Sequence, residues 1–176
     1  MKKPIQIVIA VFFLLFVTLS GCSMKSEEET ITDTKDIAEN TFMDDTPIES
    51  NYEFKGNSFY LPSGLEEKSG DENNLVLEDG DQTYIVFNNN NEEPLSQLHY
   101  NAAQDKNALL LESFSDENKF GYIRLQPDEG EGYELQIGIG GVKITTYTTK
   151  GKMEEDTEEL MKVAKSIAMD ATKESE

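Results

Sequence analysis

The chain of 176 residues has no tryptophan and only one cysteine (Cys22), one histidine (His99) and one arginine (Arg124). A single cysteine cannot form a disulfide within the chain. Once Cys22 is committed elsewhere, no thiol remains for a nucleophile or for a sulfur metal site. One histidine also cannot supply the ligand set of a His-rich zinc site. We therefore expect a domain held together by packing, with no cofactor.

Positive charge is also scarce, because 15 lysines and arginines stand against 35 acidic residues, which gives a formal net charge of −20. Such a surface repels phosphate backbones, and the basic patch typical of a nucleic-acid-binding protein is absent. DNA and RNA are therefore excluded as partners. A cationic ligand or a basic envelope protein would be attracted, although a solvated acidic face that aids solubility explains the same composition.

The N-terminus has the parts of an export signal, since Lys2 and Lys3 precede an apolar segment that extends from Ile5 to Leu19. The uninterrupted apolar core, residues 7–17, is about 11 residues long and would rise only about 17 Å as a helix. The hydrocarbon layer of a bilayer is about 30 Å thick. The segment is therefore too short for a permanent membrane span.

The run Leu19-Ser20-Gly21-Cys22 follows this segment and is similar to the lipobox of bacterial lipoproteins. The resemblance implies that Cys22 receives a diacylglyceryl group through a thioether and that a signal peptidase cuts between Gly21 and Cys22, which removes residues 1–21. A lone cysteine is more often a small buried hydrophobe, but this one lies between a leader and a polar stretch. Ordinary secretion and an uncleaved anchor are the alternatives to lipidation.

Lipidation makes the bilayer a partner and predicts a protein on the extracytoplasmic face of the cell membrane, because two acyl chains hold far more firmly than one. Arg124 stands beside 14 lysines, and asparagine is frequent. This bias is typical of AT-rich Gram-positive genomes and favours a Gram-positive host.

Residues 22–51 are predicted to form an acidic disordered tether, because acidic side chains outnumber Lys25 and Lys35 and apolar residues are scattered. A flexible coil of about 29 residues spans roughly 30 Å, which would hold the domain clear of the headgroups. Ile37, Phe42 and Met43 also allow a short helical or docking segment.

A single globular domain is expected over residues 52–171, followed by a disordered tail at 172–176. Asp79-Gly80 lies between two β-prone runs and predicts a type I′ hairpin, whose two central residues both need positive φ. Gly140-Gly141 predicts a second hairpin. The segments with strand character are 58–61, 75–78, 82–87, 109–114, 120–125, 133–139 and 142–149.

Two segments have helical periodicity. Pro94 can open a helix that carries Leu95, Leu98, Ala102 and Ala103. Residues 154–171 place apolar side chains at steps of three and four, as in an amphipathic C-terminal helix. This order of elements predicts an α+β fold, in which an antiparallel β-sheet of six to seven strands has one or two helices packed on one face.

The Phe-Tyr-Leu-Pro-Ser-Gly-Leu run at residues 59–65 and the terminal amphipathic helix resemble small α+β domains of the PsbP and Mog1 type. The resemblance covers most of residues 57–169. It contains no diagnostic motif and therefore implies no functional residue.

Motifs that would indicate catalysis or metal binding are mostly missing. His99 would need one of the serines Ser58, Ser96 or Ser113 and a carboxylate to form a triad, and no Gly-x-Ser-x-Gly elbow is present. The glycines from Gly138 to Gly141 lead into strand-like sequence and not into a nucleotide-binding helix. No catalytic or cofactor-binding residue is therefore assigned.

Acidic residues occur in close pairs that can be drawn as acid–base pairs or as weak divalent-cation sites, but turns explain them equally well. No run has the spacing of an EF-hand calcium loop, so no metal site is assigned. The pairs are Asp71 with Glu72, Asp79 with Asp81, and Asp128 with Glu129 and Glu131.

Two functions follow from the sequence. The first is a non-catalytic binding or interaction module of the cell envelope, with its ligand at the sheet face or the acidic rim. The alternative is a carboxylate-dependent envelope hydrolase involving His99. It requires His99 and two acidic side chains to meet in a cleft.

Overall fold

Residues 25–170, apart from 129 and 131, are described by a computed structural model. The strands are β1 (Tyr52–Phe54), β2 (Asn57–Phe59), β3 (Glu66–Gly70), β4 (Asn74–Asp79), β5 (Gln82–Asn88), β6 (Leu110–Ser115), β7 (Phe120–Pro127), β8 (Gly132–Ile139) and β9 (Val142–Thr149). The helices within these residues are α2 (Glu27–Met43), α3 (Leu98–Ala102) and α4 (Met153–Asp170).

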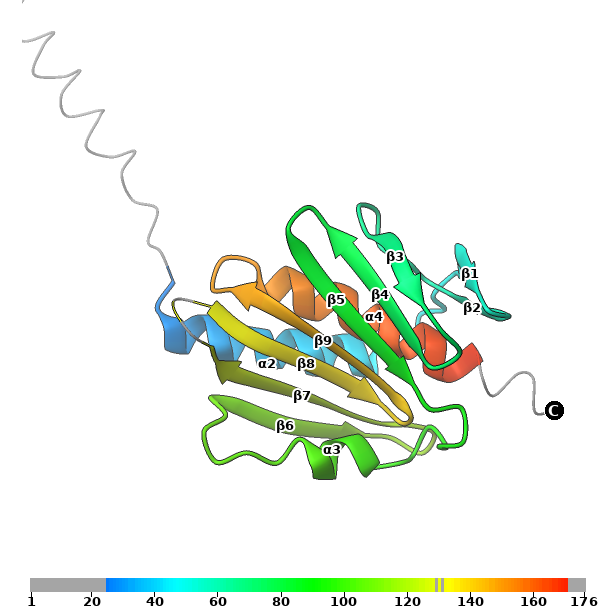
Figure 1. Cartoon of the computed structure of the whole chain (residues 1–176). Coiled ribbons are helices and arrows are strands. Elements are labelled where there is room, and N and C mark those ends of the chain that lie inside the picture. The colour runs from blue at the N-terminus through cyan, green and yellow to red at the C-terminus, as the bar shows by residue number, and fades with distance from the viewer. Residues whose placement is uncertain (1–24, 129, 131, 171–176) are drawn as a thin grey trace, which may run out of the picture.

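Seven of the strands form one antiparallel sheet in the order β3-β4-β5-β9-β8-β7-β6, and β1 pairs with β2 in a separate small sheet (Figure 1). Helices α2 and α4 lie side by side on one face of the large sheet (Figure 1). The predicted α+β fold, with a sheet of this size and a C-terminal helix, is confirmed.

The hairpin between β4 and β5 is present, but its turn differs from the prediction. Asp79 pairs with Gln82, so the central residues of the turn are Gly80 and Asp81. Only Gly80 of these has positive φ, at 57°. The predicted type I′ turn centred on Asp79-Gly80 is therefore wrong, because a turn with one positive φ needs glycine only at its first central position.

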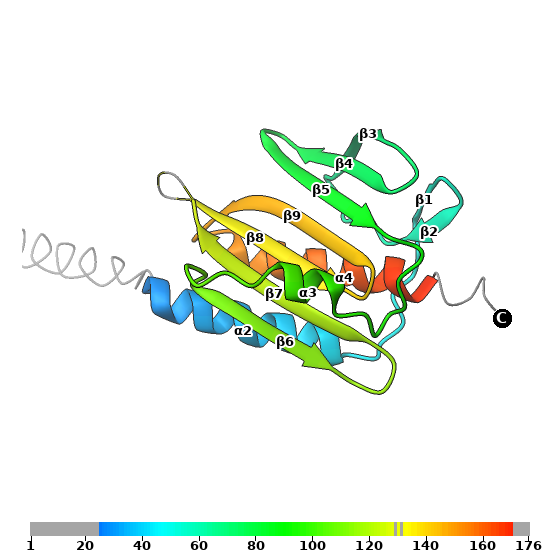
Figure 2. The same ribbon diagram turned by 60° about the horizontal axis from the view of Figure 1, so that its bottom comes forward.

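The other face of the sheet is partly covered by α3 (Figure 2), whose Tyr100 lies 5.4 Å from the ring of Phe120 and 5.9 Å from the ring of Tyr122. The predicted helix opening at Pro94 is shorter than expected and begins only at Leu98. It lies on the face of the sheet opposite to α2 and α4.

Residues 27–43 form helix α2. The prediction of a disordered tether is therefore wrong over these residues. The buried residues of α2, Thr30, Thr34, Ala38 and Phe42, occur at every fourth position and form one narrow stripe against the sheet and α4. A helix brings such residues onto one face even when most of its other side chains are acidic. The packed unit therefore starts well before residue 52.

The N-terminus of α2 is capped and fastened. The Ser26 hydroxyl accepts a hydrogen bond from the Glu29 N–H (3.1 Å), and such a cap satisfies one of the free N–H groups of the first turn. Lys25 Nζ lies 2.7 Å from both Asp33 and Glu154, the latter on α4. These contacts join the start of α2 to the start of α4.

The C-terminus of α2 is joined to α4 by Lys165, whose ammonium donates hydrogen bonds to the backbone oxygens of Thr41 (3.1 Å) and Asp44. The last carbonyls of a helix have no partner within the helix, and the lysine satisfies two of them. Helix α2 is therefore held against the domain at both ends and runs parallel to α4.

Phe42 is the large side chain of the α2 stripe and is fully buried. Its ring lies 5.8 Å from that of Phe114, and a Cβ added at Gly121 would lie 2.8 Å from it. Glycine at position 121 therefore lets the ring approach the backbone of β7. The buried Lys119 also contacts this ring, with its Nζ 4.7 Å from the Phe42 ring centroid in a cation–π contact.

Candidate functional site

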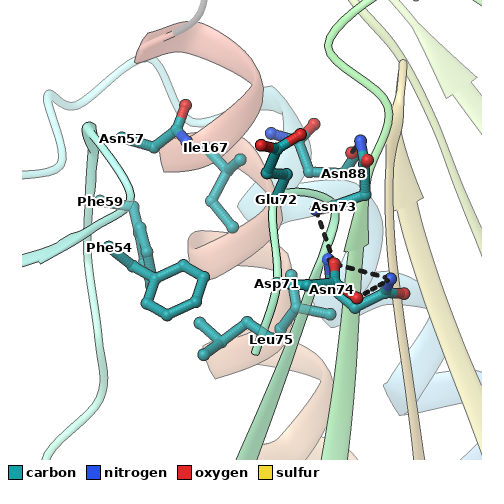
Figure 3. A pocket seen from close by; sticks show the side chains of 11 residues that line it. Phe54, Asn57, Phe59, Asp71, Glu72, Asn73, Asn74, Leu75, Asn88 and Ile167 are labelled. Atoms are coloured by element: carbon teal, nitrogen blue, oxygen red, sulfur yellow. Dashed lines mark hydrogen bonds between the residues drawn. The ribbon is translucent and has the colours of Figure 1, made fainter. Parts of the chain in front are cut away.

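A small recess lies where α4 approaches its C-terminal end, between the β1–β2 hairpin and the turn that joins β3 to β4 (Figure 3). Its volume is about 30 Å³, which suits the tip of one side chain. The apolar lining residues are Phe54, Phe59, Leu75, Val86 and Ile167. The polar lining residues are Asn57, Asp71, Glu72, Asn73, Asn74 and Asn88.

The polar rim is organised by Asp71. Its carboxylate accepts hydrogen bonds from the N–H groups of Asn73 (2.9 Å) and Asn74 (2.8 Å) and from the side-chain amide of Asn74 (3.0 Å). These bonds hold the pKa of Asp71 below its ordinary value, and the bond from the Asn73 N–H has the largest effect. Asn73 Nδ2 in turn donates to the backbone oxygen of Asn88 (2.9 Å), which ties the turn to the end of β5.

The apolar wall is positioned by contacts between the hairpin and α4. The Ser58 N–H donates to the Asp170 carboxylate (3.0 Å), and the Tyr60 N–H donates to the Ser166 hydroxyl (3.0 Å). The ring of Phe59 is buried and lies 5.4 Å from that of Tyr52. The hairpin therefore rests on the last turns of α4 at a fixed place.

The recess offers carboxylate and amide oxygens above an apolar floor. The side chains of Asn57 and Glu72 make no hydrogen bond to any other residue in the described part of the chain. They are therefore available to a ligand. Concave sites with an apolar floor and a few convergent polar groups are where proteins usually bind small groups.

A second cavity, of about 240 Å³, lies nearby, beside the end of α4, and includes Lys119 and Lys165 in its lining. Burial, and next the charge of Lys119, lowers the pKa of Lys165. Lys165 is bonded to α2 carbonyls, and Lys119 pairs with Asp116. Both ammonium groups are thus occupied in holding α2 and its neighbouring turn in place.

Asp156 is a buried carboxylate in the first turn of α4. It accepts hydrogen bonds from Thr148 (2.5 Å), the Gln82 amide (3.0 Å) and the Tyr84 hydroxyl (3.5 Å). Burial, followed by the charge of Asp156, raises the pKa of Tyr84. Because its partners come from β5 and β9, this carboxylate fastens α4 to the sheet.

His99 lies against the turn between β8 and β9. Its Nε2 lies 3.1 Å from the backbone oxygen of Gly141, and its ring meets the Phe87 ring edge-on at 5.5 Å. Burial lowers the pKa of His99. Within the described residues, no hydrogen bond links His99 to a carboxylate or to a serine. These contacts position α3 against the β8–β9 turn. The charge of Glu92 acts on His99 and opposes the lowering of its pKa, but no hydrogen bond among the described residues joins the two side chains.

The other sequence-predicted residues are dispersed. Gly21 and Cys22, the predicted cleavage and lipidation residues, lie outside the described residues, as do Glu129 and Glu131. Asp71 and Glu72 come together at the recess, whereas Asp79 lies at the far end of β4.

The asparagines that line the recess are not among the site residues predicted from the sequence. Asn73-Asn74 and the run from Asn88 to Asn91 do indicate loops, because such polar clusters mark the connections between strands. The sequence does not say that two of these loops meet.

Searches against protein-family models, curated proteins and solved structures find no match. None of the helices in the described part of the chain is long and apolar enough to cross a bilayer.

Proposed function

We propose that the chain is a non-catalytic binding module, held on the extracytoplasmic face of the cell membrane by an acylated Cys22, whose recess takes a cationic group of an envelope partner. The lipobox-like run at residues 19–22 supports the anchor. The net charge of −20 supports a cationic partner, because a field of one sign attracts and steers ligands of the other.

The recess is the observation that best supports a binding role. An alkyl ammonium group can lay its methylenes on Phe54 and Ile167 while Glu72 and the ionised Asp71 accept hydrogen bonds from its N–H groups. The volume of about 30 Å³ suits the tip of one such group. The proposed partner is a peptide, protein or polymer that presents amino groups.

The anchor is tested by intact-mass spectrometry of the protein purified from membranes. A mature chain that begins at a diacylglyceryl-modified Cys22 is expected. Cys22→Ala should leave the leader uncleaved by the lipoprotein signal peptidase, and globomycin should have the same effect on the wild type. An unmodified sulfur at Cys22, or unchanged processing in both cases, would refute the anchor.

The recess is tested with a short oligolysine peptide and the same peptide with acetylated side chains. We expect Glu72→Gln to weaken binding of oligolysine about tenfold, since a hydrogen bond to a charged group contributes about 1.5–3 kcal/mol. The matched control is Glu112→Gln, which removes the same charge from an exposed position of β6, away from the recess.

Equal losses for Glu72→Gln and Glu112→Gln would mean that only the overall field attracts the peptide. Equal affinity for the acetylated peptide would mean that amino groups are not recognised. Either result overturns the recess as the binding site.

A further inference from the structure

Little chain separates the predicted lipid attachment point from the folded domain. Lys25, the first described residue, is only three positions after Cys22, and α2 begins two positions later at Glu27. Three fully extended residues reach about 11 Å at most. The link is therefore much shorter than the domain itself.

The start of α2 lies in a cluster of turns that we term the anchor end, which comprises residues 25–29, 79–82, 132–133 and 149–154. Lys150 Nζ donates to the backbone oxygen of Lys25 (2.8 Å), and the Tyr133 hydroxyl donates to Glu27 (2.8 Å). Lys25 itself pairs with Glu154. The chain is therefore tied to the sheet and to α4 at the point where it leaves for Cys22.

The recess lies at the opposite end of the molecule. Helices α2 and α4 run parallel from the anchor end and have 17 and 18 residues, which corresponds to about 25 Å of rise. Ile167, near the end of α4, lines the recess. Figure 1 shows the start of α2 and the end of α4 at opposite ends of the domain.

We infer that the anchor end rests against the headgroups of the bilayer and that the recess faces away from the membrane, about 25 Å further out. This inference rests on the proposed lipidation of Cys22. The bilayer surface is what contacts the anchor end, because the chain leaves the domain there and at most about 11 Å of extended chain separates Lys25 from the lipid-modified Cys22.

The charges of the anchor end show which force sets this orientation. Lys25 pairs with Asp33 and Glu154, and Glu154 and Glu155 share the surface around Lys150. This mixed surface gives no strong attraction to anionic lipid. The short link and the stiff, fastened α2 set the orientation, so it should not depend on the charge of the membrane.

The test uses the mature lipidated protein in vesicles whose headgroups carry a nitroxide quencher. With Cys22 blocked by lipid, an introduced cysteine is the single labelling site. Gly151→Cys places a fluorophore on the exposed turn of the anchor end, and Glu117→Cys places it on the exposed turn between β6 and β7, at the other end. We expect strong quenching at position 151 and only background quenching at position 117, in neutral and in anionic vesicles alike.

The matched control inserts about 20 Gly/Ser residues between Met24 and Lys25. Such a linker spans about 25 Å and should remove most of the quenching at position 151 while leaving the protein on the vesicles. Equal quenching at positions 151 and 117 without the insert, or an orientation that appears only in anionic vesicles, would overturn the inference. Failure of the protein to float with vesicles would instead refute the lipid anchor, so the two failures are distinguishable.

Discussion

Helices α2 and α4 cover the same face of the sheet and have nearly the same length, yet they are held there differently. Helix α4 buries eleven residues, including Leu160 and Met161, whereas α2 buries four, of which Phe42 is the large one. Helix α4 is thus held mainly by a broad apolar face. Helix α2 depends on one aromatic side chain and on polar contacts at its two ends.

The largest expected effect comes from the aromatic contact. Phe42→Ala should lower the free energy of unfolding by about 3–5 kcal/mol, because it empties a fully buried site. Urea unfolding of the protein from Ser23 onward measures this. Leu160→Ala on α4, with about 2–5 kcal/mol expected, is the matched substitution. A loss below about 1 kcal/mol for Phe42→Ala would mean that α2 is not part of the cooperative core.

Lys165→Met should have an intermediate effect. The change leaves the carbonyls of Thr41 and Asp44 without their donor, which costs about 1–3 kcal/mol. The methionine retains much of the apolar stem, so packing against α2 changes little. Urea unfolding at neutral pH measures the loss, and a neutral or stabilising result would contradict the role of Lys165 in fastening α2.

The same variant tests a pH dependence. Because the pKa of Lys165 is lowered by burial, the folded state binds fewer protons than the unfolded state between this lowered pKa and the ordinary value of about 10.4. Stability contributed by this group therefore rises with pH across that window. The facing charges are Lys119, Asp44, Asp45 and Asp116. The deficit of Lys165→Met relative to the wild type should grow as the pH is raised toward 10, and a constant deficit would contradict the shift.

The smallest expected effect is at the start of α2. Ser26→Ala removes the hydrogen bond to the Glu29 N–H and should cost about 1 kcal/mol. Amide hydrogen exchange should speed up in the first turn of α2 and remain unchanged in α4. Faster exchange along all of α2 would show that the cap, and not Phe42, keeps this helix in place.

The sequence is sufficient for most of the sheet and for α4. Asp-Gly and Gly-Gly mark the turns of two hairpins, and the apolar residues of α4 recur over five turns of helix, so local signals agree with the tertiary structure. Strand β3 has no such signal, since all of its residues are exposed.

Helix α2 could not be read from apolar periodicity, because three of its four buried residues are Thr30, Thr34 and Ala38. These small side chains contribute little hydrophobic signal. The spacing Ser26-x-x-Glu29, which is typical of a capping box, was the sequence evidence for a helix start. An acidic composition alone predicted disorder, and long-range contacts with α4 overrode it.

The recess is less predictable than the fold. Its lining comes from the β1–β2 hairpin, the turn after β3, the end of β5 and α4. Asp71 and Glu72 are visible in the sequence as an acidic pair, but of their apolar neighbours only Leu75 is close in the sequence. Only the tertiary structure turns that pair into one wall of a concave site.

Strand β3 has a consequence for how copies of this chain behave when crowded. It forms one edge of the large sheet, and its register with β4 shifts between Glu67 and Ser69. A foreign strand that tried to extend the sheet there would meet this irregularity and the charges of Glu66, Glu67 and Lys68. The β3 edge therefore disfavours the addition of a strand from a neighbouring molecule.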